Sequence, residues 1–440
     1  MDIKVCDALC GAGKTSACIR MMNERTDARF IFVTQFLSEV ERIKEKCKAR
    51  KFLSPEGDLE SGMTKLKDIR QLLKEGRNIA TTHSLFTSYT EDIKQLVSEK
   101  EYILVLDETV NTFNMSGLKP CDINLLKNHD IIRAEDGHVE WSYSEYESDD
   151  YDGEGKFSEE VKLARSKNLL EYDGRYLFWS IPPELFACFK EAYVLTYLFH
   201  AQLLRYFFDL YGFKYDLIGV KGAGGKYEFC DISEMDRRRD LRDKIHILEH
   251  KKLNEIGAKR TDLSVSSYTL NHHDEGEGLC DKMRRNLVNL FRNIFKAPAE
   301  ETMWTVFKDC RSLVAAKGFA SSFVPYNKRA SNEYASRRYL AYCVNNFARP
   351  WEARYYREHG VEVDQDTYAL SIIVQWIFRS AIRKGEEVWV YVPSARMRSL
   401  LKQWLENLAA GKDLEPVKFK GKGAEIRRGG ELSEREGEEL

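Results

Sequence analysis

A short glycine-containing segment near the start of the chain constrains the fold most. An apolar alternating run from Ile3 to Leu9 leads into Ala8-Leu9-Cys10-Gly11-Ala12-Gly13-Lys14-Thr15, and Ser16 to Met22 has a helical pattern. The order strand, glycine turn, helix is the context that a phosphate-binding loop requires. The sequence therefore predicts a nucleoside triphosphate site at this turn.

The residue types in the loop suit that ligand. Gly11 and Gly13 let the backbone turn its N–H groups toward phosphate oxygens, and Lys14 adds a point charge for the terminal phosphates. The Thr15 hydroxyl can bind Mg²⁺. We expect ATP and Mg²⁺ to bind at six consecutive residues: Gly11, Ala12, Gly13, Lys14, Thr15 and Ser16.

Short apolar runs alternate with helical segments through the first part of the chain. The expected buried strands are Phe30 to Thr34, Asn78 to His83, Tyr102 to Leu106 and Ala192 to Leu198. This alternation predicts an α/β fold in which helices cover both faces of a parallel sheet.

Two carboxylates follow the expected strand that ends at Leu106. Asp107 and Glu108 lie at its carboxyl end, where parallel sheets place chemistry. Downstream of a phosphate loop, Asp107 is expected to hold Mg²⁺ through water, and Glu108 to orient and deprotonate the attacking water. The alternative is that the pair only ends a strand in a solvated loop.

Length and changes of pattern predict more than one domain, because 440 residues exceed a single core. We expect a first domain over residues 1–214 and a second over 215–407, followed by a flexible charged tail over 408–440. An insertion at about 111–189 in the first domain contains two Asp-Gly hairpin signals. Within it, the acidic stretch 145–154 is expected to be a mobile loop.

A helical pattern near the C-terminus carries the second strong signal. From Tyr368 to Arg383, apolar residues recur at helical spacing, while Gln375, Arg379 and Arg383 recur every four residues on another face. No Asp or Glu lies between Tyr368 and Lys384, so these arginines need partners elsewhere. They can act as fingers that stabilise charge on a transferring phosphate. The alternative is that they are surface arginines.

The region from Lys308 to Arg349 mixes basic and aromatic side chains and leaves two interpretations open. It has eight Lys or Arg against two Asp or Glu, interleaved with aromatic residues that include Phe323, Tyr326, Tyr334, Tyr339, Tyr342 and Phe347. Cations and flat rings together suit a single strand of nucleic acid. The other interpretation is an amphipathic helix over residues 332–346 with its aromatic side chains in the core.

Charge and hydropathy limit the classes of partner. The net charge is −2, so no global basic field attracts nucleic acid, and any such binding must rely on local patches. There is no apolar run of transmembrane length and no signal peptide, and the ten cysteines form no Cys-x-x-Cys pair. We expect a cytoplasmic enzyme with reduced thiols and no membrane partner.

Several separated stretches resemble, in chain order, the superfamily 2 DEAD/DEAH-like helicases of the bacteriophage and mobile-element type. Ala8 to Thr15 resembles the first motif of that family, which often begins with Ala, and Asp107-Glu108-Thr109-Val110 stands where the family has Asp-Glu-x-x. Leu195-Thr196-Tyr197 stands where it has Ser-Ala-Thr, and Gln375 to Arg383 resembles its final Gln-x-x-Gly-Arg-x-x-Arg motif. The likeness covers about residues 1–110, 190–215 and 300–407.

The resemblance implies two RecA-like P-loop domains that close on ATP and step along a strand. It implies that nucleic-acid backbone contacts come from Thr34, Gln35, Thr82 and Ser84, and that catalysis uses Lys14, Glu108, Gln375 and an arginine finger. In the final motif Phe378 replaces the usual Gly and the last arginine lies one residue late, so the choice between Arg379 and Arg383 stays open.

We therefore expect an ATP-dependent helicase or translocase that hydrolyses ATP in the cleft between the two domains. Its partner is single-stranded or tailed nucleic acid, with DNA favoured and the choice between DNA and RNA left open, and replication or phage proteins are further partners in a bacterial or phage-infected cell. The alternative is a nucleotide-gated ATPase switch that recruits partners in phage replication or defence without unwinding. Polarity, unwinding, oligomeric state and the role of the insertion stay open at this point.

Overall fold

The computed structural model describes residues 1–57, 63–135, 137–142, 157–270, 278–327 and 333–420. The chain divides into two compact units, each described here by itself. The first consists of Met1–Arg239 and Ala348–Ser371, and the second of Asp240–Phe347 and Ile372–Leu440. None of the described helices is both long enough and apolar enough to cross a membrane.

The first unit is built on a seven-stranded sheet with the order β12-β11-β1-β10-β4-β2-β3. The strands from β11 to β3 run parallel to their neighbours, and only β12 is antiparallel. Their bounds are β1 Asp2–Asp7, β2 Phe30–Thr34, β3 Ile79–Thr82, β4 Ile103–Asp107, β10 Glu191–Thr196, β11 Asp216–Ala223 and β12 Lys226–Asp231.

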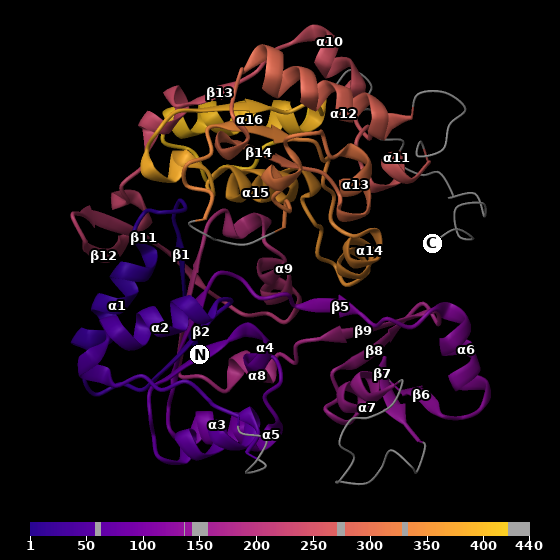
Figure 1. Ribbon diagram of the computed structural model, residues 1–440. Coiled ribbons are helices and arrows are strands. Elements are labelled where there is room, and N and C mark those ends of the chain that lie inside the picture. The colour runs from indigo at the N-terminus through magenta and orange to yellow at the C-terminus, as the bar shows by residue number, and fades with distance from the viewer. Residues whose placement is uncertain (58–62, 136, 143–156, 271–277, 328–332, 421–440) are drawn as a thin grey trace. The chain divides into compact units, whose positions relative to one another are not determined.

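The central strands are continuous apolar runs because both faces of the sheet are covered, so residues on either side of a strand are buried. Every residue of β2 is buried, as are Ile103 to Leu106 of β4. The predicted α/β class with helix-flanked parallel sheets is confirmed (Figure 1). The helices of the first unit are α1 Lys14–Glu24, α2 Leu37–Lys46, α3 Lys65–Lys74, α4 His83–Phe86, α5 Glu91–Glu99, α6 Pro120–Asn128, α7 Ser158–Arg165, α8 Glu184–Ala187, α9 Leu203–Leu210 and α14 Pro350–Glu358.

The expected insertion forms a second, antiparallel sheet in the first unit, with the order β5-β9-β8-β7-β6. Its two Asp-Gly signals fall at the β6–β7 and β8–β9 hairpins, as predicted. The acidic stretch 145–154 lies outside the described residues. The strands are β5 Phe113–Met115, β6 Ile132–Glu135, β7 His138–Trp141, β8 Leu169–Tyr172 and β9 Tyr176–Ser180.

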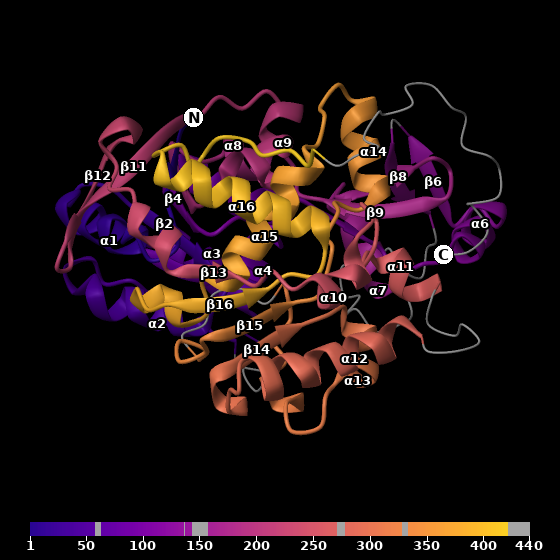
Figure 2. The ribbon, with the colours of Figure 1, turned by 90° about the horizontal axis from the view of Figure 1, so that it is seen from above.

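The second unit has a parallel four-stranded sheet with the order β13-β16-β15-β14, flanked by helices (Figure 2). Its strands are β13 Ile245–Ile247, β14 Thr302–Thr305, β15 Tyr339–Tyr342 and β16 Val388–Tyr391. Its helices are α10 Lys251–Asn254, α11 Val265–Leu270, α12 Leu279–Asn289, α13 Arg311–Val314 and α16 Ala395–Ala409. Helix α15, Gln365–Ile377, includes the division between the units at residue 371.

The division between the units differs from the expected one at residue 214. The hairpin of β11 and β12 turns at Gly222 to Gly225, and β11 pairs in parallel with β1, so this hairpin belongs to the first sheet. Residues 348–371 also belong to the first unit. At the other end, Asp413 and Val417 are buried, so the first part of the expected tail is packed, and residues 421–440 lie outside the described part.

Two helix predictions in the second half of the chain are wrong. The amphipathic helix over 332–346, one of the two interpretations left open, does not form in the described residues 333–346: residues 333–336 form turns, and Tyr339–Tyr342 form β15, which pairs between two parallel strands. The expected helix from Tyr368 to Arg383 ends at Ile377. There the N–H of Ala381 donates to the Arg337 carbonyl at 2.9 Å, and the Ser380 hydroxyl donates to the Ile377 carbonyl at 2.6 Å. The helix has already tightened into a turn before Ala381, because the N–H groups of Arg379 and Ser380 donate three residues back, to the carbonyls of Trp376 and Ile377.

Candidate functional site

The glycine loop joins the carboxyl end of β1 to the start of α1. Gly11 and Gly13 have φ values of 81° and 95°, in the left-handed region where a side chain would be strained. No side chain caps α1, whose first N–H groups have no acceptor within a helix. The loop therefore turns an uncapped helix N-terminus toward the carboxyl edge of the sheet, which is a favourable position for an anion.

Lys14 is buried within this loop, with a side chain that is 7% exposed. Its Nζ donates to the carbonyl oxygens of Ala8 at 2.6 Å and Leu9 at 3.2 Å. The ammonium group is thus held inside the turn. Thr15 and Ser16, the next residues of α1, are partly exposed, as are Ala12 and Gly13.

A hydrogen bond joins the loop to the predicted acidic pair. The Thr15 hydroxyl donates to Asp107 Oδ1 at 3.2 Å, across 92 residues of sequence. The contact forms because only β10 separates β1 from β4, so both strand ends meet at one edge of the sheet. A hydroxyl and a carboxylate are oxygen ligands of the kind that Mg²⁺ accepts, and Mg²⁺ typically takes few protein ligands beside phosphate oxygens. These two residues fit a magnesium ion.

The electrostatics at Asp107 are those of a crowded acidic site. Burial, and then the charges of Glu108 and Glu39, raise the pKa of Asp107 to about 7, while Lys14 and the Thr15 hydroxyl act in the opposite direction. Glu39 lies on α2, and sequence reasoning did not identify it. The charges of Glu108 and Glu39 therefore disfavour the ionised form of Asp107, and a bound cation would offset them.

Glu108 follows β4 in a strained backbone conformation. Its φ is 69°, a region that non-glycine residues rarely adopt, and its N–H donates to the Leu195 carbonyl at 3.0 Å. Such conformations cost about 1–3 kcal/mol and cluster at functional sites. The next residue, Thr109, donates to Gln202 Oε1 at 3.4 Å, so the segment after the acidic pair contacts the segment after β10.

Asp7 fixes the segment that follows β10, and sequence reasoning missed it. Its side chain is 1% exposed, and its two oxygens accept the N–H groups of Leu198 at 2.7 Å and Phe199 at 2.8 Å. Thr196, the hydroxyl residue of the expected Leu-Thr-Tyr motif, is buried beside this turn. The only sequence signal for this role was an Asp directly before the glycine loop, and an Asp in that position can equally mark the end of a strand.

The four residues expected to contact nucleic acid lie at the carboxyl ends of β2 and β3. Thr34 and Thr82 are register partners in this parallel pair, and Gln35 and Ser84 follow them. Thr34 is 2% exposed, Gln35 and Thr82 are partly exposed, and Ser84 is exposed. The same edge of the sheet therefore carries the glycine loop, the acidic pair and these polar side chains.

The three residues expected to act on the terminal phosphate lie in the second unit, in three settings. Gln375 is on α15 and partly buried, while Arg379 follows the helix end and is 3% exposed. Arg379 Nη1 donates to the carbonyls of Pro325 at 3.3 Å and Tyr326 at 3.4 Å. Arg383 lies in the 3-10 turn Ala381–Lys384 and is exposed. The predicted single row of side chains is wrong, because α15 ends before the two arginines.

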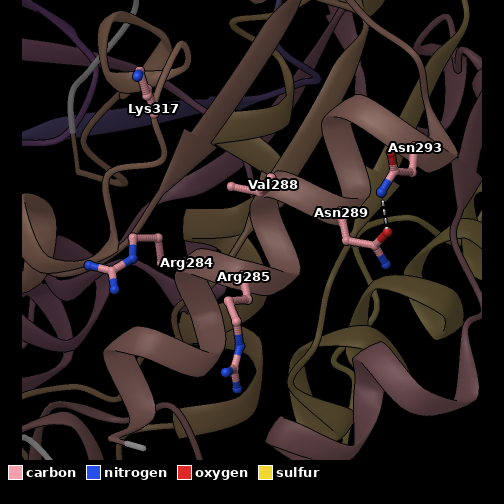
Figure 3. A pocket seen from close by; sticks show the side chains of 6 residues that line it. All are labelled: Arg284, Arg285, Val288, Asn289, Asn293 and Lys317. Carbon is pink, nitrogen blue, oxygen red and sulfur yellow. Dashed lines mark hydrogen bonds between the residues drawn. The ribbon is translucent and has the colours of Figure 1, made fainter.

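A second concave site lies in the second unit (Figure 3). This pocket of about 320 Å³ is lined by Arg284, Arg285, Val288, Asn289, Asn293 and Lys317. Asn293 donates to Asn289 at 2.8 Å, and Arg284 pairs with Asp281. In Figure 3 the charged ends of Arg284, Arg285 and Lys317 point in different directions. The lining is cationic, but it does not converge on one point as a closed anion site would.

The fold and the loop geometry define a class: parallel α/β proteins with a glycine loop between the first strand and the first helix, beside a strand that ends in Asp-Glu. The chain belongs to the YonV family. It is 37% identical over 411 residues to the "SPbeta prophage-derived uncharacterized protein YonV" of Bacillus subtilis (strain 168), covering 92% of this chain and 99% of that protein. The family model of the YonV C-terminal Rossmann-like domain matches residues 239–405, a range that begins at the division between the units.

The chain was also matched to a solved structure. "Structure of S. tokodaii Xpd4" matches 92% of this chain and 94% of that chain, with 13% identity and a TM-score of 0.49.

Proposed function

We propose that this protein is an ATP-dependent nucleic-acid helicase or translocase of the superfamily 2 type. The observation that carries the proposal is the Thr15–Asp107 hydrogen bond, which joins the glycine loop to the acidic strand end. A phosphate loop linked in this way to a carboxylate is what ATP with Mg²⁺ requires, and the uncapped N-terminus of α1 supports an anion there.

Each predicted site residue in the loop and the acidic pair of the first unit has a proposed role. Lys14 exchanges its two carbonyl acceptors for phosphate oxygens, and the N–H groups from Gly11 to Ser16 contact the phosphates. Thr15 and Asp107 hold Mg²⁺, which neutralises the developing charge on the phosphates when it is bound. Glu108 accepts a proton from the attacking water.

Roles in the second unit belong to the same proposal. Gln375 and one of Arg379 and Arg383 complete the site when the two units close on ATP. The Arg383 side chain is exposed, whereas Arg379 must first leave the two carbonyls that it contacts. Thr34, Gln35, Thr82 and Ser84 contact a nucleic-acid backbone, which such proteins grip largely without regard to sequence.

Single-stranded or tailed DNA is the proposed partner, with phage or replication proteins as further partners in a bacterial cell. The SPbeta prophage origin named for the YonV relative supports a phage setting. The cationic pocket beside α12 offers local charge for backbone phosphates in a chain whose net charge is only −2.

The decisive experiment measures ATP hydrolysis with and without single-stranded DNA, single-stranded RNA and duplex, at two salt concentrations. We expect single strands to stimulate hydrolysis, with a stimulation that weakens steeply as salt rises. Lys14→Ala and Glu108→Gln should lower the rate at least about 100-fold. Lys74→Ala and Glu45→Gln alter exposed residues away from the loop and serve as matched controls. Equal hydrolysis with and without nucleic acid contradicts the proposal.

A nucleotide-gated switch is the second candidate, because a glycine loop joined to an acidic strand end would serve ATP binding and hydrolysis in a switch as well. A switch needs ATP-driven closure but no stepping. Displacement of a labelled strand from a tailed duplex separates the two functions, because a switch hydrolyses ATP and leaves the duplex intact.

A further inference from the structure

The β11–β12 hairpin extends past the end of β1, alongside the glycine loop. Pairing between β11 and β1 ends at Ile218 opposite Cys6, yet β11 continues to Ala223 before the chain turns back. Tyr227 is the partner of Gly222 in this projecting part of the hairpin. The hairpin therefore lies beside the loop, on the side of β1 that faces away from β10 (Figure 1).

Tyr227 lies directly against the loop. A Cβ atom added to Gly13 would come within 2.3 to 2.6 Å of three atoms of the Tyr227 ring. Position 13 thus requires glycine for two reasons: its φ is positive, and the Tyr227 ring occupies the space that a Cβ atom would need. Tyr227 is partly exposed, and residues 222–226 at the hairpin tip are exposed, so this side of the loop is open to a ligand.

The two sides of the loop differ in chemistry. Toward β10 and β4 lie the Thr15 hydroxyl and Asp107, which suit the metal-bound terminal phosphates. Toward β11 lies an aromatic ring, with Arg20 of α1 paired to Glu228 of β12 at 3.1 Å behind it. A triphosphate whose terminal phosphate lies on the Asp107 side directs its nucleoside to the other side.

We propose that Tyr227 stacks on the base of the nucleoside triphosphate, so that the β11–β12 hairpin forms the base-binding wall of the site. This inference rests on the proposed nucleotide site and adds the group that holds the base. Every base presents a flat π face, so stacking on a tyrosine holds the nucleotide with little selectivity among bases. Selectivity between ATP and GTP is accordingly weak.

The test compares two ligands that share phosphates and differ in the base. Calorimetry on the full chain measures the Kd of Mg²⁺·ATP and of inorganic tripolyphosphate for wild type and for Tyr227→Ala, Tyr227→Leu and Tyr227→Phe. We expect the Ala and Leu variants to bind ATP about 10-fold more weakly and tripolyphosphate within about twofold of wild type. The Phe variant should match wild type for both ligands.

The Leu and Phe variants separate stacking from packing, since both fill space beside Gly13 but only Phe has a π face. Tyr176→Ala, a partly exposed tyrosine in the β8–β9 hairpin, is the matched control and should bind both ligands normally. The inference is wrong if Tyr227→Ala binds ATP as wild type does. It is also wrong if this variant loses affinity equally for ATP and tripolyphosphate, or binds both more tightly. Failure of wild type to bind either ligand overturns the proposed nucleotide site itself, and the inference with it.

Discussion

At the scale of single residues, burial sets the charge state of several carboxyl groups. Glu352 lies in the first turn of α14, where a helix N-terminus favours a negative charge, yet it is only 3% exposed. Burial raises the pKa of Glu352 to about 7, and nearby Arg349 offsets this only in part. The cost of burying the charge thus exceeds the gain from its surroundings.

Replacement of Glu352 by Gln is expected to stabilise the protein at pH 8. Because the pKa of Glu352 rises on folding, the folded state keeps the proton longer, and stability is lost as pH rises from about 4.5 through 7. Glu352→Gln removes this loss, so its free energy of unfolding should exceed that of wild type by about 1–3 kcal/mol at pH 8 and equal it near pH 4. Urea melts at the two pH values measure the difference.

Glu358 on the same helix is the control for this prediction. It is exposed, and hydrogen bonds from Tyr172 and Arg354 lower its pKa, so Glu358→Gln should give no stabilisation at pH 8. If the Glu352→Gln variant is no more stable than wild type at pH 8, the buried charge of Glu352 does not destabilise the folded protein, and the prediction is wrong.

At the scale of elements, the site depends on where strands end. The loop after β1, the acidic pair after β4 and the polar groups after β2 and β3 meet at one edge because these strands are parallel. Asp7 adds a specific tie, since its carboxylate connects the end of β1 to the turn after β10.

Asp7→Asn tests that tie between elements. The amide keeps one acceptor oxygen but turns an NH₂ group toward a backbone N–H, so one buried N–H loses its partner at a cost of about 1–3 kcal/mol. We expect a lower melting temperature and slower ATP hydrolysis. Asp2→Asn, at the exposed start of the same strand, should change neither. Equal melting curves for the Asp7 variant and wild type would show that the tie is dispensable.

The polar groups after β2 and β3 carry a second prediction at this scale. If Gln35 and Ser84 contact the nucleic-acid backbone, Gln35→Ala and Ser84→Ala should each raise the half-saturating concentration of single-stranded DNA about 3- to 10-fold. Fluorescence anisotropy with a labelled oligonucleotide measures this change. Ser98→Ala on α5 is the exposed control. Wild-type affinity in both variants would remove these positions from the proposed interface.

At the scale of the whole molecule, the first unit is discontinuous in sequence. Residues 348–371 return to it after the chain has formed most of the second unit. Tyr356 of α14 is fully buried there, with its ring 5.3 Å from that of Phe113 and 5.8 Å from that of Tyr206. Its hydroxyl donates to the Leu203 carbonyl at 3.3 Å.

Tyr356→Ala should therefore destabilise the first unit from a position late in the sequence. Loss of a large buried ring costs about 3–5 kcal/mol. Hydrogen exchange should show faster exchange in β5 and α9, while β14, β15 and β16 of the second unit keep their protection. Arg357→Ala, at the exposed neighbouring position, should leave the pattern unchanged. Faster exchange confined to the second unit would contradict the assignment of this segment to the first.

The sequence by itself determined the parts of the protein that depend on local pattern. Short apolar runs rich in aromatic and β-branched residues, such as Phe30–Thr34, favour strands of a covered sheet, and the positive φ at Gly11 and Gly13 favours residues without a side chain. The loop, the strands and the acidic pair were therefore predictable from the sequence.

Only the tertiary structure decided features that depend on contacts between distant residues. The Arg337 carbonyl accepts the N–H of Ala381 beyond the end of α15, and Asp7 accepts the N–H groups of Leu198 and Phe199. Tyr227 lies against Gly13 because the β11–β12 hairpin is added at the sheet edge. Periodicity reports which face of an element is buried, but it does not report which partner supplies the burial. The physical reason is that hydrogen bonds and packing between segments far apart in sequence leave no repeat in either segment.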